Sequence, residues 1–220
     1  MNYPKLSDLD MTHPQVAMAV DVARKWAAEK AQGNDLSVVL SGPNGIGKTH
    51  IANAILWSMR NMPEGLDGYE LPSGRFFSAA NLIVELGAYA DESGRIRQPP
   101  VDYFIGNAPI VVLDDVGAKI LMPYIKGDMQ AEEIQARWFI LFEYCLHRTR
   151  IVRTDDGAEV VPYPPSLIIT TNLDLTGGAE SPFAKHIGIR SWDRLQVMAP
   201  KGFMVAMNNV ESYRKRMSGR

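Results

Sequence analysis

The stretch that decides the fold reads Gly42-Pro43-Asn44-Gly45-Ile46-Gly47-Lys48-Thr49. It fits the pattern G-x-x-x-x-G-K-[ST] at every fixed position. An apolar run at residues 37–40 predicts a buried strand before it, and a helical periodicity from residue 48 to about residue 61 predicts a helix after it. Glycines let backbone N–H groups curl around phosphate oxygens, and the helix N-terminus adds the positive end of its dipole. The stretch therefore predicts a phosphate-binding loop.

Two side chains of this loop have expected roles toward a nucleotide and its metal ion. Lys48 is expected to place its charge on the β- and γ-phosphates, and the Thr49 hydroxyl is expected to bind Mg²⁺. An ordinary glycine-rich turn between a strand and a helix is the alternative. The complete set of predicted nucleotide-binding residues is Gly42, Pro43, Asn44, Gly45, Ile46, Gly47, Lys48, Thr49 and His50.

Another apolar run, at residues 110–113, is followed directly by Asp114 and Asp115. A strand here would deliver both carboxylates to the carboxyl edge of a parallel sheet, near the phosphate loop. Asp114 is expected to hold the Mg²⁺ shell, and Asp115 to orient or deprotonate the attacking water. Glutamate is commoner in the second role, so the shorter Asp115 must act through a differently placed water. An Asp-rich turn is the alternative.

Polar residues that follow a further strand pattern, at residues 166–171, complete the candidate site. Asn172 is expected to sense the γ-phosphate or to position the water, with turn formation as the alternative. Arg190 and Arg194 come next and, four residues apart, share one face of a predicted helix. An arginine there can project to a neighbouring subunit's γ-phosphate and raise the rate by several powers of ten. A solvated or Asp-paired surface residue is the alternative for each.

The order of the patterns predicts the fold class. Strand patterns occur at residues 37–40, 74–78, 110–113, 167–170 and 203–206, and helix patterns lie between them at 48–61, 81–89 and 131–148. Such alternation predicts an α/β fold with a parallel sheet covered on both faces. Residues 1–35 are expected to form an arm and one helix. Thr12 and Gln15 predict a capping box at its start, and Gly33 its end.

Composition and charge bound the class of protein. The chain has 220 residues, 46% of them hydrophobic, so it can bury a proper core. A net charge of −2 means that any nucleic-acid contact must come from local patches. The single cysteine, Cys145, excludes an intramolecular disulfide and favours a reducing compartment. The sequence shows neither a membrane-spanning apolar stretch nor a secretion signal, so a cytoplasmic protein without a membrane partner is expected.

Two other classes of phosphate-loop protein fit less well. Residues 114–117 also spell the D-x-x-G of GTPases, and residues 171–174 approach their guanine motif. However, Asn172 stands where a lysine would stack on guanine, and no switch threonine is evident between residues 59 and 75. A small-molecule kinase would normally close an arginine-rich lid over its substrate, whereas Arg190 and Arg194 lie late in the chain.

As a set, these motifs resemble the ATPase domain of the DnaC-type helicase loaders, the AAA+ group that also includes the transposition helper IstB. The resemblance covers about residues 36–216. The stretches that carry it are Gly47-Lys48-Thr49-His50-Ile51-Ala52-Asn53-Ala54-Ile55, Leu113-Asp114-Asp115-Val116-Gly117, Ile169-Thr170-Thr171-Asn172, Trp192-Asp193-Arg194-Leu195 and Glu211-Ser212-Tyr213-Arg214.

The resemblance implies a P-loop AAA+ three-layer αβα core, with a parallel five-stranded sheet in the order 5-1-4-3-2 and no separate C-terminal lid domain. It implies ATP and Mg²⁺ bound between neighbouring copies of the chain in a ring or open spiral. Arg194 would be the arginine finger supplied in trans, and Asn172 the first sensor. The implied catalytic set is Lys48, Asp115, Asn172 and Arg194. Single-stranded DNA and a replicative helicase or other DNA-processing protein are the implied partners.

Two segments depart from the family pattern. Family loaders place a helicase-binding domain before the ATPase core, here residues 36–220, whereas residues 1–35 predict only an arm and a helix. The second departure is a hairpin expected at residues 149–165, with Asp156-Gly157 as its turn. Basic residues that are candidates for DNA contact form three clusters, Arg148-Arg150-Arg153, Arg95-Arg97 and Arg214-Lys215-Arg216-Arg220. A transposition helper and a nucleotide-dependent binding module with little turnover remain alternative functions.

Overall fold

The computed structural model describes residues 9, 11–60, 74–87, 89–90, 96–97, 101–118, 130–154 and 157–208 of the chain. Its centre is a five-stranded sheet with neighbouring strands in the order β2-β5-β8-β1-β9, and all pairs are parallel. The strands are β1 (Val38–Ser41), β2 (Arg75–Ser78), β5 (Ile110–Val116), β8 (Ser166–Thr171) and β9 (Met204–Ala206). Numbered by their own order along the chain, they read 5-1-4-3-2, so the predicted α/β fold and strand order are confirmed.

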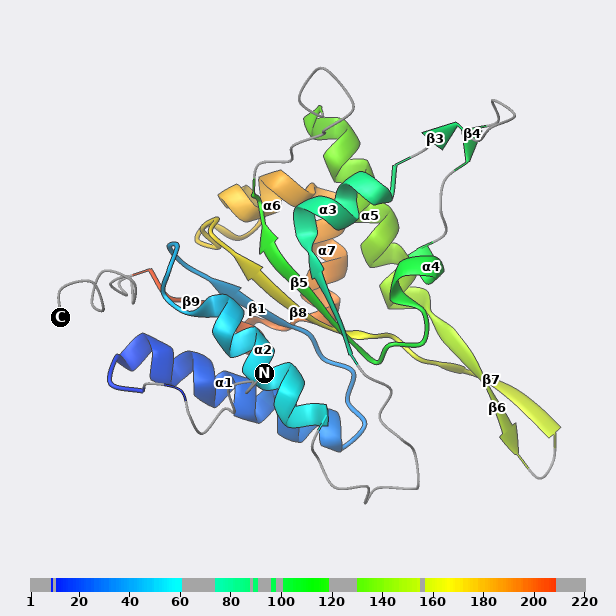
Figure 1. Ribbon diagram of the computed structural model, residues 1–220, viewed down its shortest axis with the longest axis horizontal. Coiled ribbons are helices and arrows are strands. Elements are labelled where there is room, and N and C mark those ends of the chain that lie inside the picture. Colours follow the sequence, from blue (N-terminus) through cyan, green and yellow to red (C-terminus); the bar gives the residue numbers. More distant parts are fainter. Residues whose placement is uncertain are drawn as a thin grey trace.

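Helices cover both faces of the sheet (Figure 1). One face carries α1 (Pro14–Ala31) and α2 (Lys48–Arg60). The other carries α3 (Ala79–Glu85), α4 (Val101–Ile105), α5 (Ala131–His147), α6 (Pro182–Ile187) and α7 (Ile189–Met198). Alternate strand residues serve the two layers: Val111 and Leu113 pack on the α5 side, whereas Ile110 and Val112 pack on the α1–α2 side. This period of two gives the strands their continuous apolar runs.

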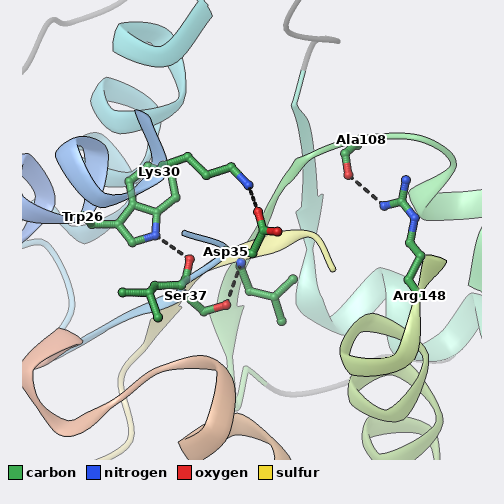
Figure 2. A network of polar contacts seen from close by, with 8 residues as sticks. Trp26, Lys30, Asp35, Ser37, Ala108 and Arg148 are labelled. Atoms are coloured by element: carbon green, nitrogen blue, oxygen red, sulfur yellow. Dashed lines mark hydrogen bonds and ion pairs between the residues drawn. The ribbon is translucent and has the colours of Figure 1, made fainter. Parts of the chain in front are cut away.

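The first helix belongs to the same folded unit as the sheet. Its buried residues, Val16, Ala19, Val20, Ala23, Trp26 and Ala27, join the core cluster of α2 and β1. Figure 2 shows the polar contacts that fix its end: Trp26 Nε1 donates to the Leu36 carbonyl over 2.7 Å, and Lys30 pairs with Asp35. Ser37 Oγ then accepts from the Leu167 amide, 2.9 Å away, which joins the start of β1 to β8.

The predicted capping box at the start of α1 is wrong. His13 is the N-cap residue, and its Nδ1 accepts from the Gln15 amide over 3.3 Å. The cause is Pro14. The residue before a proline avoids helical dihedrals, so His13 stays extended and the helix begins at Pro14. At the other end Gly33, with a φ of +85°, follows the C-cap as predicted.

The helix predicted over residues 81–89 is shorter than expected. α3 ends at Glu85, and Tyr89 already lies in the short strand β3 (Tyr89–Ala90), which pairs with β4 (Ile96–Arg97). Arg137 of α5 explains the early end, since its Nη1 donates to the carbonyls of Ile83 and Val84 over 2.8 and 3.1 Å. The last carbonyls of α3 are thereby satisfied without another helical turn.

The expected insertion is a hairpin of β6 (Thr149–Thr154) and β7 (Gly157–Pro162), which projects away from the sheet (Figure 1). The register pairs Thr154 with Gly157, so Gly157 lies in the strand and not in the turn as predicted. Arg148 anchors the base of the hairpin, because its Nη1 donates to the Ala108 carbonyl over 2.9 Å (Figure 2). Among the helices of the described residues, none is long and apolar enough to cross a membrane.

Candidate functional site

The glycine-rich loop connects the end of β1 to the start of α2, as the motif predicts. Gly42 has a φ of +150°, and a Cβ there would lie 2.6 Å from Ile46 Cδ1 and 2.9 Å from the Met207 carbonyl oxygen. Gly47 directly precedes α2 and has a φ of +104°, a backbone conformation that residues with a side chain rarely adopt. The loop backbone is therefore free to turn back over the helix N-terminus, where anions bind.

Lys48 extends from the first turn of α2 into this loop. Its Nζ donates to the carbonyls of Gly42 and Pro43 over 2.7 and 2.9 Å, and to Asn172 Oδ1 over 2.7 Å. The side chain is thus held by its own loop on one side and by the end of β8 on the other. These contacts place the ammonium group at the centre of the predicted phosphate site.

The charge of Lys48 is balanced between opposite influences. Burial lowers the pKa of its ammonium group, and the carboxylates of Asp115 and Asp114 act in the opposite direction. Burial is the larger influence, so the pKa lies below the ordinary lysine value. Phosphate oxygens beside the ammonium group would favour its charged form. With one ammonium group and two carboxylates, the site suits a phosphate ligand that brings a divalent cation.

Asp114 and Asp115 end β5, which β8 separates from β1. Thr49 Oγ1 donates to Asp114 Oδ1 over 2.9 Å, and Thr170 Oγ1 donates to the same oxygen over 2.6 Å. Asn172 Nδ2 donates to Asp115 Oδ1 over 2.5 Å. Five predicted site residues, Lys48, Thr49, Asp114, Asp115 and Asn172, therefore belong to one polar network at the carboxyl edge of the sheet.

The remaining loop residues differ in what they offer a ligand. Ile46 is 4% exposed and packs into the α1–α2 core, so only its backbone faces outward from the loop. The side chains of Pro43, Asn44 and His50 are exposed. The structure therefore supports backbone binding by the loop, with His50 at its accessible rim.

Arg194 is not brought to this network within one chain. Its Nε donates to Glu143 Oε2 of α5 over 2.7 Å, and its guanidinium lies 5.0 Å from the centre of the Phe139 ring. Arg190, one turn earlier on α7, is exposed. No hydrogen bond of the described residues joins either arginine to the polar network, and the role of Arg194 toward a neighbouring copy stays a prediction.

Thr170 is the site residue that the sequence did not single out. Its hydroxyl donates to Asp114 and accepts from the Asp115 amide, 2.8 Å away. Thr170 stands in a stretch that carries the family resemblance, but threonine is common in buried strands for its β-branched shape, so the sequence assigned it no role of its own. Only the position of β8 between β1 and β5 could have revealed it.

The donor set suits a magnesium–triphosphate ligand. Thr49 and Asp114 offer one hydroxyl and one carboxylate, the hard oxygen ligands that Mg²⁺ takes together with phosphate oxygens and water. Within the described residues, no three His, Cys, Asp or Glu side chains gather in a way that would hold a metal alone. Lys48 adds the point charge for the phosphates, and the carboxylate of Asp115 lies one hydrogen bond beyond Asn172.

The fold is that of a P-loop AAA+ core. The parallel sheet has the glycine-rich loop after β1, paired carboxylates near the end of β5, at Asp114 and Asp115, and an asparagine after β8. No protein-family model matches the chain, and no curated protein matches it.

Similar solved structures agree with that class. The DnaC helicase loader superposes with a TM-score of 0.58 at 19% identity, covering 91% of this chain and 96% of its own. DnaI superposes with a TM-score of 0.53 at 19% identity, covering 92% of this chain and 89% of its own. NtrX from Brucella abortus, solved in complex with ATP, gives a TM-score of 0.52 at 16% identity and covers 96% of this chain and 41% of its own. At these identities the likeness establishes the fold.

Proposed function

We propose that the protein binds ATP with Mg²⁺, hydrolyses it, and acts on DNA as a AAA+ ATPase of the helicase-loader type with a helicase or other DNA-processing partner. The observation that carries the proposal is the polar network at the sheet edge. In it, hydrogen bonds of 2.5–2.9 Å connect the loop lysine Lys48, the proposed metal ligands Thr49 and Asp114, the proposed base Asp115 and the proposed sensor Asn172. Thr170 links the two carboxylate residues.

Each group in the network has a chemical role in this proposal. The Lys48 ammonium neutralises phosphate oxygens, and Thr49 with Asp114 holds the metal ion, which supplies further neutralisation of the phosphates. Asp115 accepts a proton from the attacking water or orients it, and Asn172 holds the Asp115 carboxylate in place through its amide. Because phosphoryl transfer needs mainly positioning and charge stabilisation, this set suffices for all but the transition-state arginine.

The similar structures support the rest of the proposal. NtrX, of which 41% is covered by the match, was solved in complex with ATP, and the DnaC neighbour is a helicase loader. By this analogy we infer that the chain associates with itself and that residues 36–220 carry the ATPase activity, with the hairpin as an insertion and with α1 packed on them in the same core. A cytoplasmic location is part of the proposal. Cys145 does not bear on it, because burial raises the pKa of its thiol to about 12 and would make it unreactive in any compartment.

Replacing Asp115 with Asn tests whether hydrolysis is the activity of this site. We expect Asp115→Asn to keep ATP binding, because Lys48 and the loop are unchanged, while steady-state turnover falls by about 100-fold or more with the loss of the base. Phosphate release and nucleotide affinity are measured side by side. Asp21→Asn on α1, which changes an exposed carboxylate outside the polar network, is the control. Equal turnover in Asp115→Asn and wild type would remove Asp115 from the mechanism, and absent turnover in wild type would favour a binding module.

DNA contact is proposed for the β6–β7 hairpin. Of the three predicted arginine clusters, this is the one with described side chains, and it exposes Arg150 and Arg153 on a projecting arm. We expect the double variant Arg150→Ala/Arg153→Ala to bind single-stranded DNA more weakly and to lower the salt dependence by about one unit per lost phosphate contact. Fluorescence anisotropy over a salt series measures this, with Arg24→Ala on α1 as the control. An unchanged salt slope would exclude the hairpin as the DNA contact.

A further inference from the structure

Thr170 occupies a distinctive place in the site, between the two carboxylate residues at the end of β5. It lies in β8, is 1% exposed, and forms both of its hydrogen bonds to those residues. Its Oγ1 donates to Asp114 Oδ1 over 2.6 Å and accepts from the Asp115 amide over 2.8 Å. Because the hydroxyl is buried, it is not placed to contact a nucleotide directly.

We propose that Thr170 is a positioning residue, which aims Asp114 at the metal ion and fixes the backbone that carries Asp115. The inference rests on the proposed function of the site as a Mg²⁺–ATP site. It adds a role that the phosphate-loop and acidic motifs do not contain, and it assigns that role to the strand lying between them.

The backbone at Asp115 shows why a hydroxyl is needed there. The pairing of β5 with β8 shifts register between Leu113 and Val116, and Asp115 has a φ of +60°, the one positive value of a non-glycine residue among the described residues. A residue in the left-handed region persists when its surroundings hold it there. At this irregular point the hydroxyl of Thr170 accepts the hydrogen bond of the Asp115 amide.

The contacts of Asp114 show what the same hydroxyl does for the metal ligand. Oδ1 accepts from Thr49 on α2 and from Thr170 on β8, so donors from two elements restrict the rotation of the carboxylate. The Thr49 hydroxyl could bind Mg²⁺ through its oxygen and still donate its hydrogen to Asp114, but the metal ion would then draw on this contact, whereas the contact from the buried Thr170 involves no metal ligand other than Asp114 itself. A carboxylate held by such an outer hydrogen bond binds metal better than a free one, by about 10- to 100-fold in known sites.

The test measures metal-dependent nucleotide binding in the full chain with a fluorescent ATP analogue. In EDTA, Thr170→Val and wild type should bind the analogue with equal affinity, since the loop and Lys48 are intact. With Mg²⁺, half-maximal tightening should require about 10-fold more metal in Thr170→Val, and turnover should fall by a similar factor. Thr170→Ser keeps the hydroxyl and should restore both values to within about 2-fold of wild type.

Thr171→Val is the matched control for a merely structural loss. Thr171 is also buried in β8, and its hydroxyl also donates once, to the Val116 carbonyl, and accepts once, from the Leu173 amide. It forms neither contact with the two carboxylate residues. Thermal unfolding should therefore change similarly in both valine variants, while the Mg²⁺ requirement rises only in Thr170→Val.

Three results would overturn the inference. An unchanged Mg²⁺ requirement in folded Thr170→Val would do so, as would an equal rise in Thr171→Val, or a failure of Thr170→Ser to recover. If wild type bound the analogue with no response to Mg²⁺, the proposed function would fail and this inference with it. If wild type responded to Mg²⁺ and hydrolysed ATP normally, a negative result for Thr170→Val would leave the proposed function standing.

Discussion

Replacing Lys48 with Ala is expected to lower ATP affinity and to reduce turnover by about 100- to 1,000-fold. The ammonium group is the buried cation of the loop, and it lies within hydrogen-bond distance of Gly42, Pro43 and Asn172. Without it, phosphate charge that develops in the transition state has no preorganised partner in the loop. Lys48→Ala should therefore lower ATP affinity more than Asp115→Asn does, because Asp115 contributes only after ATP is bound.

Calorimetry and phosphate release measure the two effects of Lys48→Ala. Lys201→Ala, which removes an exposed lysine outside the loop, is the matched control. The alanine variant also removes a charge that burial disfavours, so we expect the fold without nucleotide to survive the change. ATP affinity and turnover equal to wild type would contradict the assignment of this loop as the phosphate site.

Arg194→Ala is expected to cost about 1,000-fold or more in turnover while ATP binding to the same chain stays nearly unchanged. The reason is geometric: Arg194 contacts Glu143 and Phe139 of α5 and not the phosphate loop of its own chain. If a neighbouring copy receives this arginine at its γ-phosphate, the residue acts on a site that it does not help to bind.

Mixing two inactive variants separates this explanation from a structural one. Arg194→Ala retains a complete Lys48 site, and Lys48→Ala retains the arginine, so a mixed interface restores one competent site. Partial recovery of turnover in the mixture is the expected result. Failure to recover in folded, co-assembling protein would argue for a structural role of the Arg194–Glu143 pair. Arg190→Ala is the comparison, since it removes the exposed arginine one turn earlier on α7. If turnover recovered when Lys48→Ala was mixed with an inactive Arg190→Ala, but not when it was mixed with Arg194→Ala, Arg190 would be the arginine finger.

Much of the fold was predictable from local patterns. The five strand patterns became the five strands of the sheet. For β1, β5 and β8 the reason is that residues buried on both faces of a parallel sheet leave a continuous apolar run, whereas the edge strand β2 is mostly exposed. Errors arose where one distant side chain or one neighbouring residue decided the outcome. Arg137 of α5 satisfies the carbonyls that end α3, and Pro14 moves the cap of α1 to His13. Neither effect is visible in a local periodicity.

The sequence by itself determined which residues could form the site. Lys48, Thr49, Asp114, Asp115 and Asn172 were predicted from their motifs, and the structure joins them in one polar network, while their chemical roles stay predictions. Such short motifs depend on the local backbone of a strand, a turn and a helix, so they can be read without knowing which distant residues pack against them.

Only the tertiary structure decided how these groups hold one another. The sheet places β8 between β1 and β5, which brings Asn172 between Lys48 and Asp115 and gives Thr170 both of its contacts. It also turns Arg194 toward α5, away from the loop that precedes it by well over a hundred residues. The physical reason is that hydrogen bonds across strands depend on strand order and register, which chain spacing does not encode.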